Sequence, residues 1–406
     1  MQITRRADSL YSDIWMPDET VRIRKEARAF ADDVLRPMAY ALNTTAERRD
    51  GFPRAAFEAI GAAGLYTIPF SADVGGRGLE FPTLATMTVA EELGYYAPGT
   101  ASALYDGQAI LCGKTLERAP ESLRSRYLPR LARGELVGAF ATSEPDASTD
   151  LSPAMMRTIA TKVEGGWRID GRKRWITNSV AADFILVLCR SDDNAQTFLL
   201  VDMHQPGITV GDPDLKMGNH AQLTADVVFD DAFTPDENVI GAPGAGLKGA
   251  LSALTLGRMG IGAIGVGMAQ AAFDQACAYM EKRKVFGQEL ARFQHWQFAF
   301  ANHAIGIENA RSLYQKAAYR FDREGMADIE AAMAKIAGSG LAVDVARDAI
   351  QACGAYGFAR HVQGEGHGLP LEAIYRDAKI GEIYEGANEI QRWIIARRIF
   401  GRGITG

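Results

Sequence analysis

The sequence predicts a multi-domain α+β protein with an N-terminal helical domain, a middle antiparallel β-domain and a C-terminal helical bundle. Two changes of period predict this order. The helical spacing of apolar residues gives way to alternation at about Glu135, and it returns past the glycine-rich segment 241–244. A chain of 406 residues with 47% hydrophobic residues is also too long for one simple core. We therefore place the three domains at 1–134, 135–244 and 245–406.

Helical spacing runs through the first domain. Apolar residues that recur from Val21 to Leu35 predict a first helix, which Pro37 is expected to end. Phe52 opens a second helical pattern, and a further helix is expected over 123–131. The first third of the chain is therefore predicted to be helical.

Short alternating runs fill the second domain, and long alanine-rich runs fill the third. Strands are expected near 158–163, 167–169, 184–188, 198–201, 207–210 and 225–229. Helices are expected at 262–280, 293–322 and 327–352. The letters G-x-G-x-x-G occur at 260–265, but no strand pattern precedes them and no acidic residue follows at the expected distance. We interpret this stretch as a helix that packs closely rather than as a dinucleotide site.

Composition argues against several classes of function. A net charge of −6, with no cluster of Lys and Arg among aromatic residues, argues against nucleic-acid binding. The longest uncharged stretch, 259–273, is interrupted by glycines and is shorter than the roughly 18 residues that a membrane span needs. The six histidines form no metal-like cluster, so no metal site is expected. The four cysteines lie far apart and the N-terminus lacks the apolar run of a signal peptide, which predicts reduced thiols and a cytoplasmic protein.

A carboxylate near the C-terminus is the strongest catalytic candidate. Glu385 is followed at once by glycine, and it lies between two apolar series of helical spacing. A carboxylate at the mouth between two packed helices is partly desolvated, which raises its pKa and makes it a usable base at neutral pH. We therefore expect Glu385 to act as a general base.

Three other segments carry candidate binding groups, each with a plainer alternative. The strand end at 140–150 offers hydroxyls and backbone N–H groups to the polar edge of a flat heterocycle, although an ordinary polar turn has the same composition. Trp175 and Thr177 lie on a following strand, where a tryptophan is more often part of a core. Arg283 suits a pyrophosphate because a guanidinium donates two parallel hydrogen bonds, whereas most surface arginines are simply solvated.

Motifs along almost the whole chain resemble one enzyme family. The series R-D-A-K-I-x-x-I-Y-E-G-x-x-x-I-Q-R at 376–392 resembles the C-terminal signature of the acyl-CoA dehydrogenases. The F-P…G-x-x-G-L…P…G-G-x-G…E-E-L series of the first third is similar to their N-terminal helical domain. The resemblance implies FAD-dependent α,β-dehydrogenation of an acyl-CoA thioester to the trans-2-enoyl-CoA. Glu385 would take the pro-R α-proton, and flavin N5 would accept the β-hydride.

The resemblance also assigns residues to the cofactor and the substrate. Flavin-ring contacts are implied for Phe140, Thr142, Ser143, Trp175 and Thr177. The pyrophosphate and adenine end are implied to be held by Arg283, Phe286 and Gln294 of a neighbouring subunit, and Gln351 is implied to reach the same cofactor. Substrate contacts are implied for Thr149, Arg258, Tyr384 and Gly386. The thioester oxygen would be held by the Glu385 backbone N–H and a ribityl hydroxyl.

Several positions depart from the family pattern. Asp146 and Ser148 replace glycines near the strand end, which affects the local backbone and the pantetheine contacts. Ala355 replaces a glycine after Gln351, and Ala387 and Glu389 replace the usual Thr and Gln behind the base, where flavin contacts are affected.

Other features bear on the substrate. Some branched-chain and long-chain members carry their base immediately before the arginine that matches Arg258, and Gly257 occupies that position here, so Glu385 has no rival within the motif. Asp106 and Gln108 are candidates for adding polarity to the acyl chamber. The glycine-rich loop 361–368 is longer than typical, and it shapes a substrate entrance, accepts an acyl-carrier protein or is a plain solvent loop.

The family resemblance leaves reaction type and substrate partly open. The same scaffold hosts flavin oxidases, monooxygenases and desulfinases, and a carrier-protein thioester is an alternative substrate to an acyl-CoA. A non-catalytic helical assembly protein would bind no flavin, and the set Trp175, Arg283 and Glu385 speaks against it. The resemblance further implies electron-transfer flavoprotein as the electron acceptor and a homo-oligomer, a tetramer. Neither a nucleic acid nor a membrane is expected as a partner.

Overall fold

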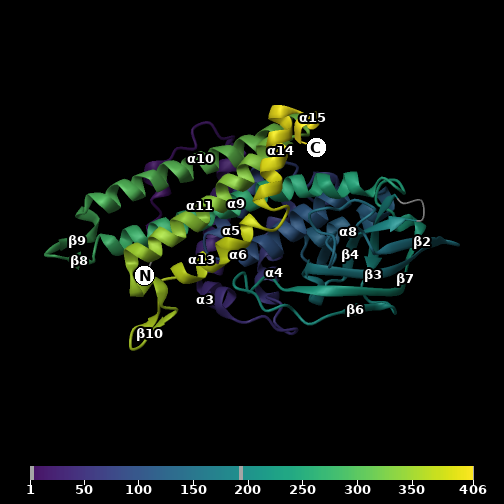
Figure 1. Ribbon diagram of the computed structural model, residues 1–406, viewed down its shortest axis with the longest axis horizontal. Coiled ribbons are helices and arrows are strands. Elements are labelled where there is room, and N and C mark those ends of the chain that lie inside the picture. Colours follow the sequence, from purple (N-terminus) through teal and green to yellow (C-terminus); the bar gives the residue numbers. More distant parts are fainter. Residues whose placement is uncertain (1–3, 192–194, 406) are drawn as a thin grey trace.

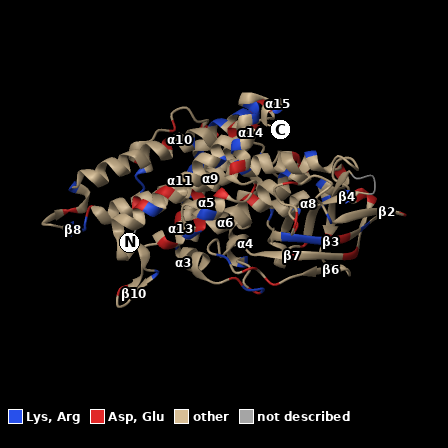
Figure 2. Cartoon of the chain, in the orientation of Figure 1, with Lys and Arg blue, Asp and Glu red and all other residues tan. Residues whose placement is uncertain are grey.

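A computed structural model describes residues 4–191 and 195–405 and shows helices, then a sheet, then a helical bundle along the chain (Figure 1). The sheet lies at one end of the elongated molecule, and a short hairpin, β8 (Lys284–Val285) with β9 (Gln288–Glu289), lies at the other. Acidic and basic residues are interspersed over the helical parts and the sheet (Figure 2). The predicted fold class is therefore confirmed.

The N-terminal part is helical, as predicted, but its first helix does not end where the sequence suggested. Its helices are α1 (Ala7–Leu10), α2 (Asp18–Phe30), α3 (Arg36–Thr44), α4 (Arg54–Ala62), α5 (Pro82–Gly94), α6 (Pro98–Thr100), α7 (Lys114–Glu117) and α8 (Glu121–Ala132), with π-helical stretches η1 (Ala31–Leu35) and η4 (Ala101–Gly113). Pro37 was expected to end the first helix, and this prediction is wrong. Pro37 lies in the first turn of α3, and the π-helical residues of η1 carry the helical path from α2 into it. The change to π-helical turns lies directly before Pro37, and the path continues past it although the proline has no N–H to donate.

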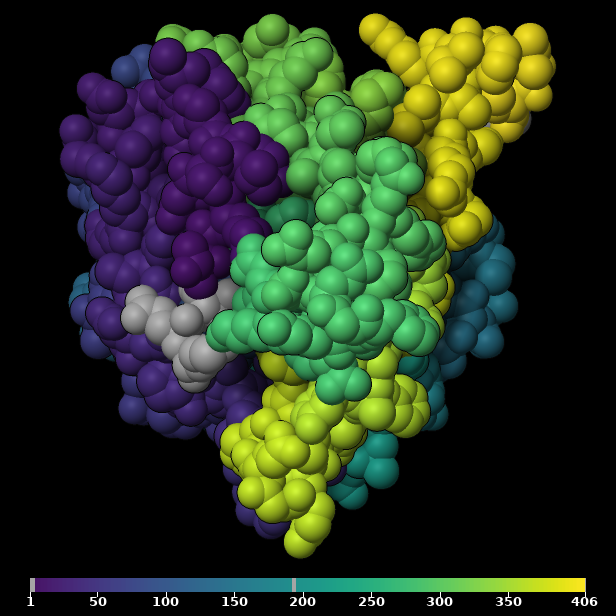
Figure 3. Space-filling model, turned by 90° about the vertical axis from the view of Figure 1, so that its left-hand side faces the viewer, coloured from purple at the N-terminus to yellow at the C-terminus, as the bar shows by residue number. Residues whose placement is uncertain are grey.

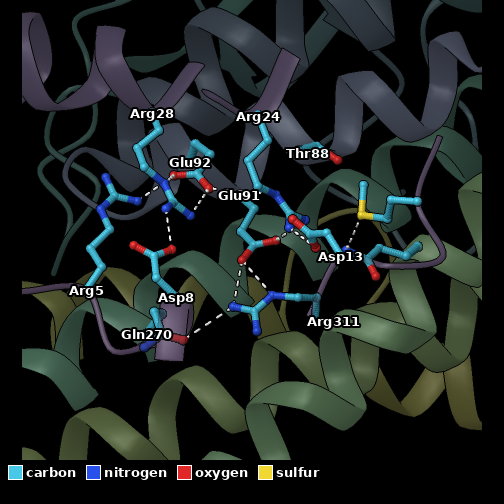
Figure 4. Close-up of polar contacts among 12 residues, drawn as sticks. Arg5, Asp8, Asp13, Arg24, Arg28, Thr88, Glu91, Glu92, Gln270 and Arg311 are labelled. Atoms are coloured by element: carbon cyan, nitrogen blue, oxygen red, sulfur yellow. Dashed lines mark hydrogen bonds and ion pairs between the residues drawn. The ribbon is translucent and has the colours of Figure 1, made fainter. Parts of the chain in front are cut away.

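A network of buried ion pairs joins the N-terminal part to the bundle (Figure 4). Glu91 of α5 accepts hydrogen bonds from Arg311 Nε at 2.9 Å and from the Tyr314 hydroxyl. Its neighbour Glu92 accepts from Arg28 through Nη2 at 3.1 Å and Nε at 3.2 Å, and also pairs with Arg5. Segments far apart in the sequence are thus held together by buried pairs of opposite charge.

The β-domain follows the predicted alternation closely. Its strands are β1 (Gly138–Ala141), β2 (Ile159–Val163), β3 (Gly166–Thr177), β4 (Phe184–Ser191), β5 (Gln196–Asp202), β6 (Ile208–Val210) and β7 (Thr224–Pro235). They form one sheet in the order β1-β4-β2-β3-β7-β6, with β5 paired to β4. The sheet is antiparallel except where β1 and β2 each run parallel to β4. It is therefore a mixed sheet rather than the wholly antiparallel one that local alternation suggested, because alternation does not report strand direction.

Three long helices form the core of the C-terminal bundle. They are α9 (Gly246–Met280), α10 (Gln294–Glu324) and α11 (Asp328–Cys353), and they are followed by α12 (Ala355–Phe358), α13 (Leu371–Ala378), α14 (Asn388–Phe400) and α15 (Arg402–Thr405). By length and composition α9 could cross a membrane, but 83% of its most apolar window is buried inside the protein. It is the central core helix of the bundle.

The glycines of 260–265 let α11 approach α9 closely. A Cβ atom on Gly262 would lie 2.7 Å from the Ala334 carbonyl oxygen, and one on Gly265 would lie 2.5 Å from Gly338. Both distances are shorter than real Cβ contacts allow. The prediction that this G-x-G-x-x-G stretch is a closely packed helix is confirmed.

The loop 361–368 forms a short hairpin, β10 (His361–Val362) with β11 (Gly366–His367), that projects from the body (Figures 1 and 3). The His367 ring stacks on Tyr40 with 3.6 Å between centroids, and the Tyr356 hydroxyl donates to Glu365 at 3.1 Å. Most of its residues are exposed, which fits the solvent-loop interpretation.

Candidate active site

Glu385 lies in the loop between the 3₁₀ turn Lys379–Glu382 and α14, in an unusual backbone conformation. Its φ is 54° and that of Gly386 is 86°, both in the left-handed region. The Glu385 carbonyl accepts a long hydrogen bond from Arg258 Nε at 3.4 Å, and the Gly386 carbonyl accepts one from Gln391 Nε2 at 2.8 Å. A non-glycine residue held in this region by its surroundings is typical of functional sites.

Gly257 of α9 makes room for the Glu385 side chain. A Cβ atom at position 257 would lie 1.9 Å from Glu385 Oε2. A side chain at 257 and the Glu385 carboxyl group therefore cannot occupy their places together. This geometry fits the expectation that Glu385 has no rival base at the position before Arg258.

The site has the electrostatics expected of a base at neutral pH. Burial raises the pKa of Glu385 to about 7, against the opposing effects of the neighbouring Asp106 carboxyl group and the charges of Arg258 and Lys335. Burial and then the charge of Glu385 raise the pKa of Asp106 well above its usual range. Asp106 was expected only to add polarity to the acyl chamber, but it lies against the predicted base itself. Gln108 instead bonds the backbone of Gly138, donating to its carbonyl and accepting from its N–H, both at 2.8 Å.

Lys335 is a functional candidate that sequence reasoning missed. Its fully buried ammonium group donates to Asn388 Oδ1 at 2.8 Å, and Asn388 Nδ2 donates to Ser339 Oγ at 3.1 Å. Burial lowers the pKa of Lys335 to about 8. These bonds join α11 to the start of α14 directly behind Glu385. A single lysine inside an alanine-rich helical run was the signal that could have revealed it.

The strand-end turn after β1 is held by buried polar groups. Lys173 Nζ donates to the Thr142 carbonyl at 3.2 Å and pairs with Glu144 at 2.8 Å, and both charged groups are buried. The Arg174 N–H donates to the Ser143 carbonyl at 3.0 Å. The turn is therefore fixed to β3 beside Trp175.

Trp175 and Thr177 lie where β3 is irregular. The register of β3 against β7 shifts between Lys173 and Ile176, and Trp175 has φ 62°. Its indole is 51% exposed, so it is not the core tryptophan of the alternative interpretation. The Thr177 hydroxyl accepts from Gln222 Nε2 at 3.1 Å, and Phe140 packs edge-on against Phe198. The exposed indole ring offers a flat face, and the neighbouring strand-end hydroxyls offer hydrogen-bond donors. Together these groups suit the ring end of a flavin.

The structure places the remaining cofactor candidates far from this site. Arg283, Phe286, Gln294 and Gln351 are all exposed. Arg283 directly precedes β8 and Phe286 lies in the turn of the β8–β9 hairpin, which lies at the end of the molecule opposite the sheet (Figure 1). Phe286 is 97% exposed, and Arg283 makes no ion pair within the described part of the chain. Gly257 and Met280 lie at opposite ends of a helical stretch of about 35 Å at 1.5 Å per residue. Within one chain Arg283 and Phe286, which follow Met280, therefore lie far from Glu385.

The predicted substrate residues divide into two groups. Arg258, Tyr384 and Gly386 lie next to Glu385, and the Tyr384 side chain lies beside Ser102 of η4. Burial raises the pKa of Tyr384 above its ordinary value. Thr149 lies exposed in the strand-end segment.

Comparison with known proteins gives one consistent result over the chain. Family models match in order: Acyl-CoA dehydrogenase N-terminal domain at residues 17–135, middle domain at 139–232 and C-terminal domain at 244–400. The mitochondrial short-chain specific acyl-CoA dehydrogenase of Mus musculus is 34% identical over 396 residues, 97% of this chain and 92% of the relative.

Solved structures agree with the sequence matches. Butyryl-CoA dehydrogenase from Megasphaera elsdenii has a TM-score of 0.87 and 31% identity over 95% of this chain and 98% of its own. A chain in the structure of the electron transferring flavoprotein of Acidaminococcus fermentans has a TM-score of 0.89 and 31% identity over 96% of this chain and 100% of its own. The prolyl acyl carrier protein oxidase AnaB has a TM-score of 0.86 and 26% identity over 95% of this chain and 99% of its own.

Proposed function

The chain belongs to the acyl-CoA dehydrogenase family, whose members are FAD-dependent oxidoreductases, and from that premise we propose that Glu385 is the base that removes the α-proton of the acyl thioester. One observation carries the proposal. The Glu385 carboxyl group fills the space that Gly257 leaves on α9, and burial there raises its pKa to about 7. A base with this pKa is about half ionised at neutral pH, so it can both take a proton and hold it.

The residues around Glu385 suit the charge that develops in this reaction. Removing an α-proton places negative charge on the thioester oxygen, which needs a donor. The Glu385 N–H has no acceptor among the described residues, so it is free to hold that oxygen. FAD bound beside this site would supply the acceptor for the hydride that leaves Cβ. Glu385 gains the proton, and the acyl group becomes the trans-2-enoyl thioester.

The positions of the cofactor candidates support a homo-oligomer, a tetramer by family resemblance. Thr142, Ser143 and Trp175 offer a place for the flavin ring, whereas Arg283 and Phe286 lie exposed at the far end of the bundle. In this proposal the hairpin of one subunit binds the pyrophosphate and adenine end of a flavin held by its neighbour.

Mixing two inactive variants tests this shared site. Arg283→Ala lacks the pyrophosphate contact and Glu385→Gln lacks the base. If the site is shared, a mixture of the two refolded together regains part of the activity, because some assemblies pair an intact hairpin with an intact base. Two results together would overturn the shared site: the mixture regains no activity, and a single wild-type subunit binds FAD without a neighbour.

Short-chain acyl-CoAs are the proposed substrates. The relatives that support this choice are the short-chain specific enzyme of Mus musculus and the butyryl-CoA dehydrogenase of Megasphaera elsdenii. Electron-transfer flavoprotein is the proposed electron acceptor, which the similarity to a chain in the Acidaminococcus fermentans structure supports. The similarity to AnaB supports a second candidate, the oxidation of a carrier-protein thioester.

The deciding experiment follows the flavin spectrum of the purified protein without oxygen. Acyl-CoAs from C4 to C16, branched and aromatic acyl-CoAs and a prolyl carrier protein are added in turn. If one class of thioester bleaches the flavin band, that class is the substrate. If the bleaching is absent in Glu385→Gln, the result supports Glu385 as the base. Bleaching that survives Glu385→Gln overturns the assignment of Glu385. Oxygen uptake by the reduced protein in air separates an oxidase from a dehydrogenase that needs an electron carrier.

A further inference from the structure

A second carboxyl group lies beside the proposed base, and it reaches the site from a different element. Asp106 of η4 is 1% exposed. A Cβ atom on Gly260 would lie 2.1 Å from Asp106 Oδ1, just as one on Gly257 would lie 1.9 Å from Glu385 Oε2. Gly257 and Gly260 are one turn apart on the same face of α9, so the two carboxyl groups lie side by side on that face.

Neither of the facing oxygens has an ordinary hydrogen-bond partner. Asp106 Oδ1 and Glu385 Oε2 are both buried, and no donor reaches either of them within the described structure. Two ionised carboxylates offer only acceptors, and like charges cannot both persist in a buried contact. One proton between them turns this contact into a short, charge-assisted hydrogen bond.

The surrounding charges decide which group holds that proton. Glu385 is stabilised as an anion by Arg258 from α9 and Lys335 from α11. Asp106 faces the negative charge of Glu385, and no cation among the described residues acts on it in the same way. Tyr384 from the adjoining loop is neutral at physiological pH, because burial raises its pKa. In agreement, the pKa of Asp106 is raised well above its usual range, whereas that of Glu385 is raised only to about 7. The proton therefore lies on Asp106.

We propose that Asp106 is a positioning residue for the base: as a neutral carboxyl group it donates a hydrogen bond to Glu385, which keeps Glu385 ionised and fixes its orientation on α9. The proposal rests on the assignment of Glu385 as the base. When Glu385 takes the α-proton, the pair holds two protons, and loss of one to solvent restores the single shared proton before the next turnover.

Two substitutions at position 106 test the donor. Asp106→Asn has nearly the same shape and keeps a donor that is permanently neutral, whereas Asp106→Leu removes the donor. Loss of a hydrogen bond to a charged group predicts a fall in kcat/KM of about 10- to 100-fold at neutral pH in the FAD-loaded Leu variant. The acid limb of its pH profile moves up by about one to two units, because Glu385 is then harder to ionise. The Asn variant keeps its limb near the wild-type position.

Controls separate this role from a structural one. Asp274→Asn removes another buried carboxyl group, one bonded to Tyr95 and Gln270 away from the site, and it should leave the limb in place. If the Asn and Leu variants at position 106 move the limb equally, or if neither moves it, the proposal is overturned. Thermal unfolding shows whether each variant folds, and the Asn variant still tests the proposal if the Leu variant does not.

An infrared difference spectrum tests the protonation state without turnover. The spectrum of wild type minus Asp106→Asn at pH 7 should contain the C=O band of a protonated carboxyl group. Absence of that band overturns the proposal. This result does not depend on catalysis, so it stands apart from the flavin-bleaching test, in which an active Glu385→Gln enzyme would instead overturn the assignment of the base.

Discussion

Two regions of this protein bury acidic side chains and treat them in opposite ways. Glu91 lies beside Arg311 and Arg24 (Figure 4) and accepts a hydrogen bond from Tyr314. Although burial alone would raise the pKa of Glu91, these partners lower it to about 2. Glu385 has an acidic neighbour in Asp106 and an oxygen without a partner, and its pKa is raised to about 7. A buried carboxylate that is saturated with cations is fixed in one state and holds elements together. One that is buried beside a second carboxyl group, with an oxygen that no donor reaches in the described structure, can change its protonation state, which is what a base requires.

The largest effect is expected for Glu385→Gln. Gln keeps the shape but cannot accept a proton, and positioned general bases contribute about 10²- to 10⁴-fold to rate. We expect kcat to fall by that factor while FAD stays bound and the free energy of unfolding does not decrease. Stopped-flow flavin reduction and urea unfolding measure the two quantities. A variant that loses stability as much as activity would place Glu385 with the structural carboxylates.

For Glu91→Gln we expect the opposite result, a loss of folding stability with little change in kcat. The change leaves Arg311 and Arg24 buried without their anion, and removal of one partner from a buried ion pair costs about 3–5 kcal/mol of folding stability. Urea unfolding should show this loss, while kcat of the folded enzyme stays near wild type. Glu80→Gln removes an exposed partner of Arg323 and is the matched control, with little expected change. Wild-type stability in Glu91→Gln would contradict the structural role of the pair.

A smaller effect is expected for Gly257→Ala. The added Cβ would lie 1.9 Å from Glu385 Oε2, so the carboxyl group must shift, and a displacement of this kind lowers kcat by about 10²-fold. Gly249→Ala is the control on the same helix, because its Cβ would meet only Phe198 Cδ1 at 3.9 Å. That control should retain activity and gain up to about 1 kcal/mol of stability from helix propensity. Equal kcat values for the two variants would show that the space at Gly257 does not position the base.

The smallest expected effect is a difference in how pH changes the stability of the Glu91 and Glu385 variants. The pKa of Glu91 is lowered from 4.5 to about 2, so its contribution to stability is present above pH 4.5 and is lost as pH falls towards 2. The pKa of Glu385 is raised from 4.5 to about 7, so its contribution is present below pH 4.5 and is lost as pH rises through 7. Relative to wild type, Glu385→Gln should therefore gain stability between pH 4.5 and 7, and Glu91→Gln should recover only below pH 4.5. Parallel curves for the two variants would remove the distinction.

Local patterns in the sequence predicted most of the fold. Alternation and helical spacing predicted α10 and α11 to within a few residues, because each pattern reports the face that an element buries. The predicted helix 262–280 missed the glycine-rich first half of α9, and the predicted strands 167–169 and 225–229 were much shorter than β3 and β7. The parallel pairing of β1 and β2 with β4 could not be predicted, because it depends on the path of the chain between strands. The prediction that Pro37 ends the first helix was wrong because the helical path continues into α3 through π-helical residues. No composition rule signals such residues.

The candidate site could be predicted only where its residues are close in sequence. The break at Glu385 identified a carboxylate that is expected to be desolvated, and the structure shows the raised pKa. Asp106 and Lys335 come from distant helices, and their effect on Glu385 depends on tertiary contacts that spacing does not encode. The assignments of catalytic and cofactor residues themselves stay predictions for the experiments above.

The glycines of α9 have a consequence for how the protein folds. Seven of the 35 residues of this helix are glycine, and each costs about 1 kcal/mol of helix propensity relative to alanine. The isolated segment is therefore a poor helix, and α9 depends on α5, α11 and the Glu385 loop packing against it. Helix formation, bundle assembly and construction of the reactive centre are thus expected to occur in one cooperative step, so a chain with an intact bundle but an unformed reactive centre should be scarcely populated.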